Sequence, residues 1–196
     1  MTPDLYSRPD KPMRTALRVS RKAPALPPLS VRAPLIVDKV TECFVTPPAI
    51  AARMVAALGG PSAGQTLEPS AGTGALIRAL LANGYDPRRI TAVERHNTLA
   101  AHLDERLAHI VNRCFLVYAK DLSGARGFDR IVMNPPFKNV RAHIRAALSL
   151  LTRGGGVMVA LVPISYHHTE AEILEVLDSG VFIASQVKTK LIRFEV

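Results

Sequence analysis

Residues 129–139 read DRIVMNPPFKN, and this stretch decides how the chain is organised. The apolar run that precedes Asn134 is typical of a buried strand. Pro135 and Pro136 cannot donate backbone hydrogen bonds, so they cannot continue a central strand. We therefore expect the strand to end at Asn134 and to pass into a stiff, extended turn, whose rigidity holds the neighbouring side chains in a fixed geometry.

The segments on both sides of this stretch alternate between strand and helix patterns. Strands are predicted over residues 65–70, 89–95, 114–121, 130–134 and 155–165, with two short strands around Lys188. Helices are predicted over residues 46–58, 75–84, 97–108, 140–151 and 169–180, the first with Thr46 as its N-cap. This alternation indicates right-handed crossovers, and so a doubly wound α/β fold with a mainly parallel sheet and helices on both faces.

Length and charge narrow the class of protein. The chain has 196 residues, of which 48% are hydrophobic, and this suits one domain with one core. Residues 1–40 are rich in Pro, Lys and Arg, and we expect an extended or disordered arm there, followed by a folded domain at 41–196. The net charge of +9 favours nucleic acid as a partner, because Lys and Arg release counterions from phosphates; a solvated tail accounts for the charge equally well.

Other features argue against a metal site and a membrane protein. The two cysteines, Cys43 and Cys114, have no Cys or His at metal-ligand spacing, so we expect core thiols in a reduced setting. No run approaches the roughly 18 apolar residues that cross a bilayer. The amino terminus carries Asp4 and Asp10 and lacks the apolar core of a secretory signal. These observations predict a soluble, cytoplasmic protein.

The predicted strand ends carry the candidate binding residues, because open α/β sheets bind ligands outside the carboxyl ends of their strands. The first strand leads into EPSAGTGAL (68–76), where Gly72 and Gly74 would let backbone N–H groups approach a ligand. The second ends in Glu94, a carboxylate suited to ribose hydroxyls. The third ends in Asp121 and the fourth in Asn134.

Each of these signals alone also has an ordinary structural explanation. A glycine pair between a strand and a helix is most often only a turn, and loop carboxylates are usually solvated. Their joint placement at successive strand ends is the stronger signal. Since Ile77 occupies the position of the third glycine of a dinucleotide fingerprint, a nucleoside without a pyrophosphate fits the pattern better.

Three motifs occur in a fixed order: Phe44-Val45-Thr46-Pro47, Glu68-Pro69-Ser70-Ala71-Gly72-Thr73-Gly74 and Asn134-Pro135-Pro136-Phe137. They resemble those of class I S-adenosylmethionine-dependent methyltransferases, particularly the DNA methyltransferases that modify the N(6) amine of adenine. The resemblance covers about residues 40–196. It implies a seven-stranded Rossmann-like sheet with an antiparallel last strand, S-adenosyl-L-methionine as the cofactor, and no metal.

The resemblance also implies a role for each matching residue. The residues that would hold the cofactor are Phe44, Thr46, Glu68, Ser70, Ala71, Gly72 and Gly74 at its methionine end, Glu94 at the ribose, and Asp121 with Leu122 at the adenine. The catalytic residues would be Asn134, Pro135, Pro136 and Phe137. Asn134 Oδ1 and the Pro135 carbonyl would accept the two hydrogens of the target amine, and Phe137 would stack on the base.

The substrate is open at this point. A buried base must be flipped out or single-stranded to reach such a pocket, and Lys138 and Arg141 would then meet phosphates. For Arg141 and Arg145, four residues apart, an ordinary solvated helix face is the simpler and slightly favoured interpretation. His167 and His168 are expected to be surface residues. The chain has no room for the separate target-recognition domain that the DNA-modifying relatives carry, so a separate specificity subunit is one expectation. RNA amines, protein glutamine amides and a non-catalytic nucleic-acid-binding or anti-restriction role are the alternatives to adenine in DNA.

Overall fold

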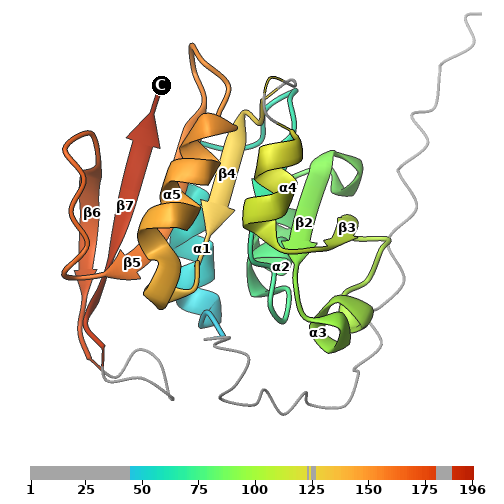
Figure 1. Cartoon of the computed structure of the whole chain (residues 1–196), viewed down its shortest axis with the longest axis horizontal. Helices are drawn as coiled ribbons and strands as arrows, with labels where there is room; N and C mark the ends of the chain where they lie inside the picture. Colours follow the sequence, from blue (N-terminus) through green and yellow to red (C-terminus); the bar gives the residue numbers. More distant parts are fainter. Residues whose placement is uncertain (1–44, 123, 125–126, 180–186) are drawn as a thin grey trace, which may run out of the picture. The chain divides into compact units, whose positions relative to one another are not determined.

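The computed structural model describes residues 45–122, 124, 127–179 and 187–196, and these residues form a seven-stranded sheet. The strand order is β3-β2-β1-β4-β5-β7-β6 (Figure 1). The five strands from β3 to β5 are parallel, and β7 runs antiparallel to both of its neighbours. The prediction of a doubly wound, mainly parallel sheet with an antiparallel last strand is confirmed. The predicted arm at residues 1–40, with Cys43 and Phe44, lies outside the described residues.

The elements of the described chain follow one another in a βα pattern as far as β5. The strands are β1 (Thr66–Glu68), β2 (Ile90–Glu94), β3 (His109–Asn112), β4 (Arg130–Met133), β5 (Val157–Pro163), β6 (Glu172–Leu177) and β7 (Thr189–Glu195). The helices are α1 (Pro48–Ala56), α2 (Ala75–Ala82), α3 (Asn97–His102), α4 (Phe115–Asp121) and α5 (Val140–Ser149), with single 3-10 turns η2 (Pro87–Arg89) and η3 (Phe137–Asn139).

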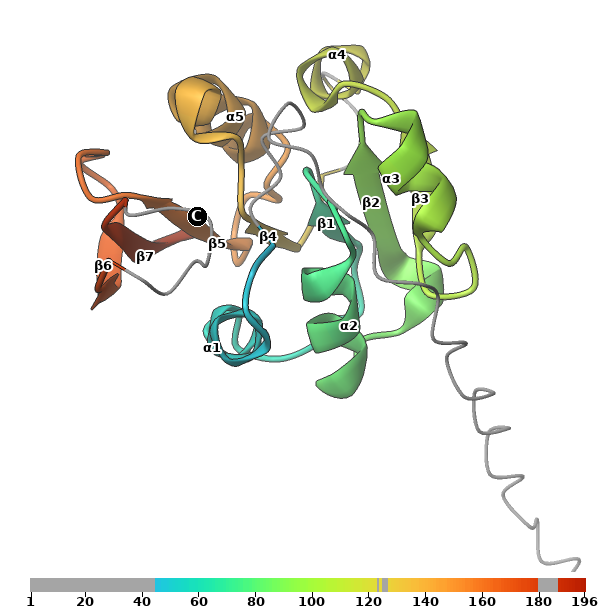
Figure 2. The same cartoon turned by 90° about the horizontal axis from the view of Figure 1, so that it is seen from below.

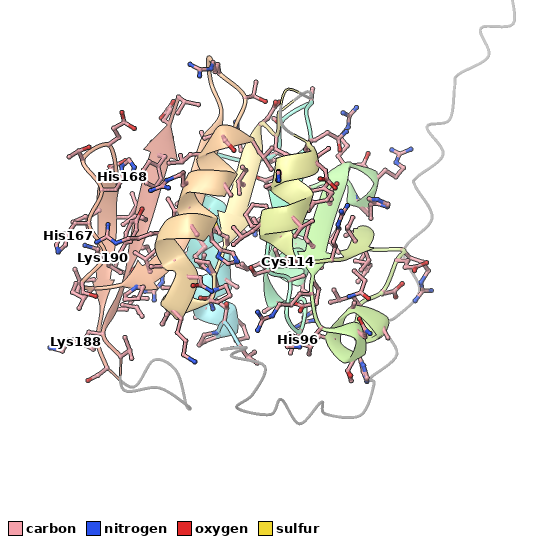
Figure 3. All side chains as sticks on the ribbon, in the orientation of Figure 1. His96, Cys114, His167, His168, Lys188 and Lys190 are labelled. Carbon is pink, nitrogen blue, oxygen red and sulfur yellow. The ribbon has the colours of Figure 1, made fainter. Side chains whose placement is uncertain are left out.

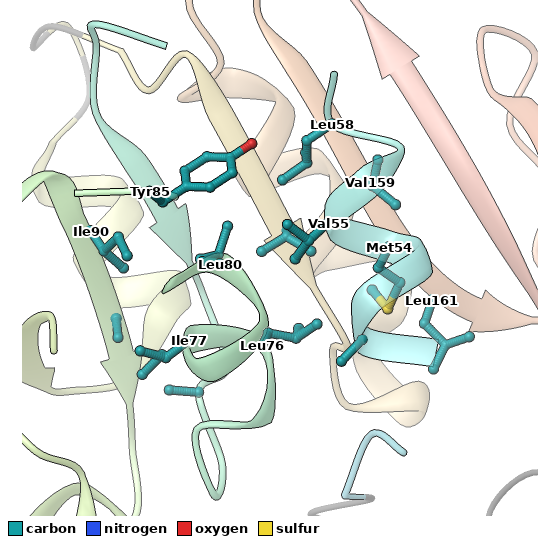
Figure 4. Close-up of a cluster of buried hydrophobic side chains, with 14 of the residues drawn as sticks. Met54, Val55, Leu58, Leu76, Ile77, Leu80, Tyr85, Ile90, Val159 and Leu161 are labelled. Atoms are coloured by element: carbon teal, nitrogen blue, oxygen red, sulfur yellow. The ribbon is translucent and has the colours of Figure 1, made fainter. Parts of the chain in front are cut away.

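Two hydrophobic cores fill the space between the sheet and its two helical layers. Helices α1 and α2 cover one face, whereas α4 and α5 cover the other (Figure 2). On the first face, Met54 of α1 and Leu80 of α2 pack with Val159 of β5 (Figure 4). On the second face, Phe115 of α4 and Ile144 of α5 belong to the same core cluster as strand side chains of β4 and β5. Strand β5 is buried along both faces, as its continuous apolar run predicts.

The segment 114–121 is a helix, so the predicted strand there is wrong. The third strand is β3, which ends at Asn112, and Cys114 is the N-cap of α4. Phe115 and Ala119 are both buried against the sheet. Their spacing of four residues is about one helical turn, which places them on the same face of a helix. As a result, Asp121 lies at the carboxyl end of a helix, and the inference that it ends a strand fails.

The segment 169–180 was predicted as a helix, and it contains the edge strand β6 instead. β6 pairs antiparallel with β7 and has a register shift between Ile173 and Glu175. Of the two short strands expected around Lys188, the second is β7, whereas residues 180–186 lie outside the described residues. The helix expected over 97–108 is α3, which ends at His102.

The turn after β4 has the predicted form. The strand ends at Met133, and the chain passes through Asn134 and two prolines into η3 and then directly into α5. Pro136 is extended, with φ −55° and ψ 121°. The prolines thus separate a buried strand from a helix without an intervening mobile loop, and they fix Asn134 at the carboxyl end of the sheet.

Candidate active site

A cavity lies at the carboxyl ends of β1, β2 and β4, where open α/β sheets bind their ligands. Its walls come from the segment before α1, the loop between β1 and α2, the end of β2, the start of α4, and the turn between β4 and α5. His96 and Cys114 both line it at this edge of the sheet (Figure 3). His167, His168, Lys188 and Lys190 lie toward the β6 and β7 side and do not line it.

The glycine loop after β1 is held against the end of β2 by Glu94. The Gly72 N–H donates to Glu94 Oε2 over 2.8 Å, and the His96 N–H donates to Glu94 Oε1 over 2.8 Å. Gly72 and Gly74 have φ values of 53° and 78°, which favour glycine. Because a carboxylate has about four acceptor positions, Glu94 can hold this loop and still accept hydrogen bonds from a ligand in the cavity.

Glu68 is a buried carboxylate with an unsatisfied oxygen. Its side chain is 1% exposed, it lines the cavity, and among the described residues nothing donates a hydrogen bond to Oε2. Burial, followed by the negative charge of Glu94, raises the pKa of Glu68 well above its ordinary value, although Arg78 lowers it in part. Two neighbouring carboxylates in a buried wall create a region that favours a positively charged ligand.

Asn134 is positioned by Thr46, which lies 88 residues earlier in the sequence. Its Nδ2 donates to Thr46 Oγ1 over 3.1 Å, and both residues line the cavity. The prediction that Thr46 caps α1 is therefore wrong. The N-cap is Pro47, which has no side-chain hydrogen bond. The hydroxyl group is instead used to hold the Asn134 amide.

The α4–α5 end of the cavity is formed by residues that the sequence motifs do not include. They are Cys114, Phe115 and Leu116 at the start of α4, and Asn139 and His143 at the start of α5. His143 is 7% exposed, and its ring lies 5.8 Å from the Phe115 ring, centroid to centroid. Cys114, Phe115 and Leu116 could have been found by recognising that β3 ends at Asn112, because they then follow a strand end.

Nine of the predicted site residues lie around this cavity. They are Thr46, Glu68, Ser70, Ala71, Gly72, Glu94, Asn134, Pro135 and Pro136. Six others do not line it: Gly74, Asp121, Leu122, Phe137, Lys138 and Arg141. Gly74 is the N-cap of α2, and Phe137 begins η3 directly after the cavity-lining Pro136.

The placement of Asp121 corrects the expectation for the adenine end of the site. Its carboxylate makes an ion pair of 2.6 Å with Arg113 at the protein surface, where the two side chains are 53% and 47% exposed. The strand end that should carry an acceptor is followed instead by Cys114, which is exposed and lines the cavity. Asp121 thus does not reach the cavity, because α4 carries it away from the sheet edge.

Two other features are absent from the described ranges. No group of three or more His, Cys, Asp or Glu side chains there is arranged to hold a metal ion. No helix there is both long enough and apolar enough to span a membrane.

Comparison with solved structures defines the class of fold. The methyltransferase subunit of a type I restriction-modification system from Streptococcus thermophilus superimposes with a TM-score of 0.64 and 14% identity, over 80% of this chain and 46% of that one. The 23S rRNA methyltransferase ErmE gives a TM-score of 0.61 and 18% identity, over 77% of this chain and 68% of that one. TrmN from Thermus thermophilus gives a TM-score of 0.56 and 17% identity, over 76% of this chain and 49% of that one.

These similarities establish that the chain has the Rossmann-like fold of class I methyltransferases. The chain spans less than half the length of the type I subunits that it resembles. Sequence comparison alone adds nothing to the structural result, since no protein-family model and no curated protein matches the chain.

Proposed function

We propose that this protein is an S-adenosylmethionine-dependent methyltransferase that modifies the exocyclic N(6) amine of adenine in DNA. The observation that carries the proposal is the common cavity of two buried carboxylates, Glu68 and Glu94, and the Asn134-Pro135-Pro136 turn. The fold supports a methyltransferase, and the motif resemblance supports adenine as the target. The catalytic unit is residues 41–196.

The residues of the cavity fit the proposed cofactor. S-adenosylmethionine carries an ammonium group and a sulfonium centre, and the unpartnered Oε2 of Glu68 offers the negative charge that such a ligand needs. Glu94 lies one strand further along the sheet and would accept hydrogen bonds from the ribose hydroxyls. When bound, the cofactor supplies an electrophilic methyl group on sulfur.

Asn134 and Pro135 prepare the target nitrogen. An exocyclic amine of a purine is a weak nucleophile because its lone pair is delocalised into the ring. Asn134 Oδ1 and the Pro135 carbonyl would accept its two N–H hydrogens, and this favours a pyramidal nitrogen with the lone pair directed at the methyl group. Thr46 accepts a hydrogen bond from Asn134 Nδ2 over 3.1 Å, which restrains the orientation of the side-chain amide. Catalysis is then mainly a matter of position and exclusion of water.

The exposed cations beside the turn suit a nucleic-acid substrate. Lys138 in η3 and Arg141 in α5 are exposed and follow the Asn-Pro-Pro turn directly. Phosphates on either side of a flipped base would meet them, and such contacts fix the register of the substrate without reading its sequence. Phe137 is half-buried at the same turn and would stack on the base.

An amine of RNA is the second candidate substrate. The chain spans 68% of ErmE, which is described as a 23S rRNA methyltransferase, against 46% of the type I subunit from Streptococcus thermophilus. The described catalytic fold is compatible with an RNA target. Action on DNA would involve a separate specificity subunit.

Methyl transfer to unmethylated DNA and RNA with labelled S-adenosylmethionine tests these proposals. Nucleoside mass spectrometry should find N(6)-methyladenine from DNA with the wild-type protein. Asn134→Ala should lose turnover by about a hundredfold or more. Asn83→Ala is the matched control, since Asn83 is exposed at the end of α2 and should keep full turnover. Label confined to RNA would transfer the proposal to the second substrate, and no label on either polymer would reject both.

A further inference from the structure

The α4–α5 end of the cavity has no carboxylate. Among the described residues that line the cavity, the acidic side chains are Glu68 and Glu94, which belong to β1 and β2. The acidic side chain of α4, Asp121, is paired with Arg113 at the surface. A nucleoside that extends from Glu94 toward α4 would therefore bring its base to a wall without a negative charge.

His143 is the buried acceptor on this wall. Its Nδ1 lies 3.1 Å from the carbonyl oxygen of Asn139, and a carbonyl can only accept, so Nδ1 carries the proton and donates. Nε2 of the neutral ring consequently has a lone pair. Among the described residues, the hydrogen bond of the His143 ring is the one that Nδ1 makes.

The surroundings of His143 keep its ring neutral and fixed. Burial lowers the pKa of His143, and the positive charge of Arg95 lowers it further, which outweighs the opposite effect of the bond to Asn139. Phe115 lies against the ring with an interplanar angle of 34°. A buried ring that is held on one edge by the backbone and on one face by Phe115 presents its other nitrogen in a defined direction.

We propose that His143 recognises the adenine of the cofactor by accepting a hydrogen bond at Nε2 from the exocyclic amine, in place of a carboxylate. This inference rests on the proposed function, since it assigns a recognition role to a residue of the same cavity. His143 is a specificity residue for the nucleoside. It lies 93% buried on the wall formed by α4 and α5, where the purine would follow the ribose held by Glu94.

The test compares two ligands that differ at the purine. S-adenosylhomocysteine has the amine, whereas S-inosylhomocysteine has a carbonyl oxygen at the same carbon, which would face the lone pair of Nε2. Calorimetry with the wild-type protein should show tighter binding of the adenine ligand by about tenfold or more, because the wrong ligand leaves a buried acceptor unpaired. His143→Leu should reduce this ratio to within about threefold of one.

His143→Gln keeps the test decisive if the leucine variant does not fold. A glutamine amide can accept from adenine and can also donate to the inosine oxygen. This variant should therefore bind S-inosylhomocysteine more tightly than the wild-type protein does, a gain that misfolding cannot produce. His102→Leu is the matched control, because His102 makes the same bond to a carbonyl four residues earlier but is exposed on α3.

The outcomes separate this inference from the proposed function. An unchanged ligand ratio in both His143 variants would overturn the role of His143 while leaving the cofactor in place. Failure of the wild-type protein to bind either ligand would overturn both. A ratio that falls in the His143 variants and is kept in His102→Leu supports the inference.

Discussion

Asn134 Nδ2 donates a hydrogen bond to Thr46 Oγ1 over 3.1 Å, and this bond joins residues that are 88 positions apart in the sequence. The bond distinguishes the two ends of the Asn134 amide, because the nitrogen is the end that donates to Thr46. Two of the three sequence motifs are thus physically connected at the point where the target amine would be held.

Removal of the Thr46 hydroxyl should impair turnover more than cofactor binding. In Thr46→Val the Asn134 amide loses its hydrogen bond to the hydroxyl and is less firmly oriented, so the rate of methyl transfer should fall by about tenfold, the cost of one lost hydrogen bond in a positioned site. Thr46→Ser keeps the hydroxyl and should stay within about threefold of the wild type. Single-turnover methylation and cofactor calorimetry measure the two effects separately. An equal loss of rate in the serine variant would indicate that the methyl group, rather than the bond to Asn134, matters.

Glu68→Gln should stabilise the ligand-free protein and weaken cofactor binding. The wild-type carboxylate is buried with one oxygen unpartnered; an unpartnered buried polar atom costs about 1–3 kcal/mol, and a charged one costs more. Because the pKa of Glu68 is raised in the folded protein, wild-type stability relative to the variant should fall as the pH rises through that raised pKa. The difference should vanish as the pH falls toward the ordinary pKa of glutamate.

Urea denaturation of the ligand-free protein across pH 5–9 measures this effect. Glu105→Gln is the control, because it removes the same charge at an exposed position. Affinity for S-adenosylhomocysteine should drop about tenfold in Glu68→Gln, which removes the counter-charge for the ligand ammonium group. A variant that is no more stable than the wild type at pH 9 would contradict the account of Glu68.

Asp121→Asn should leave cofactor affinity unchanged within about twofold. Its ion pair with Arg113 is about half exposed, and such pairs contribute only about 0–1 kcal/mol to stability. Glu94→Gln is the contrasting variant. It replaces an acceptor of two backbone N–H groups with a side chain that has one donor end, so both stability and affinity should fall. Calorimetry of the two variants decides which carboxylate belongs to the site; a large loss in Asp121→Asn would reverse the assignment.

Arg141→Gln should weaken nucleic-acid binding and lower its salt dependence. If Arg141 contacts one phosphate, the slope of log K against log salt should decrease in magnitude by about one. Arg88→Gln is the control, since Arg88 is exposed but precedes β2, at the opposite ends of the parallel strands. Binding titrations at several salt concentrations give both slopes. Equal changes in the two variants would mean that Arg141 acts only through net charge.

The sequence was sufficient for the elements whose signals are local. β5 is a long apolar run, α2 lies between a glycine turn and Gly84, and the two prolines after Asn134 end β4 where predicted. The fold class followed because these elements alternate. Eight of the nine predicted cavity residues come from contiguous motifs, and the ninth, Glu94, was found because it ends a strand.

Elements determined by distant packing were predicted wrongly. The segment FLVYAKD of α4 is rich in residues that favour strands, and only the burial of Phe115 and Ala119 beside α5 selects the helix. The spacing of the apolar residues of β6 fits the period of a helix as well as that of a strand. Pairing with β7 selects the strand. The error at α4 displaced the expected acceptor to Asp121 and left His143 unnoticed, because the wall that includes it forms only when α4 and α5 pack together.

The two backbone contacts of Glu94 also bear on the kinetics of ligand capture. The same carboxylate already orders Gly72 and His96 in the ligand-free protein. The loop is therefore ordered when the protein folds, and ligand binding does not have to lower its conformational entropy. Association should then be a single fast step whose rate follows ligand concentration linearly, without a slow conformational phase. Differences in affinity between ligands of this cavity should accordingly appear in their dissociation rates rather than in their association rates.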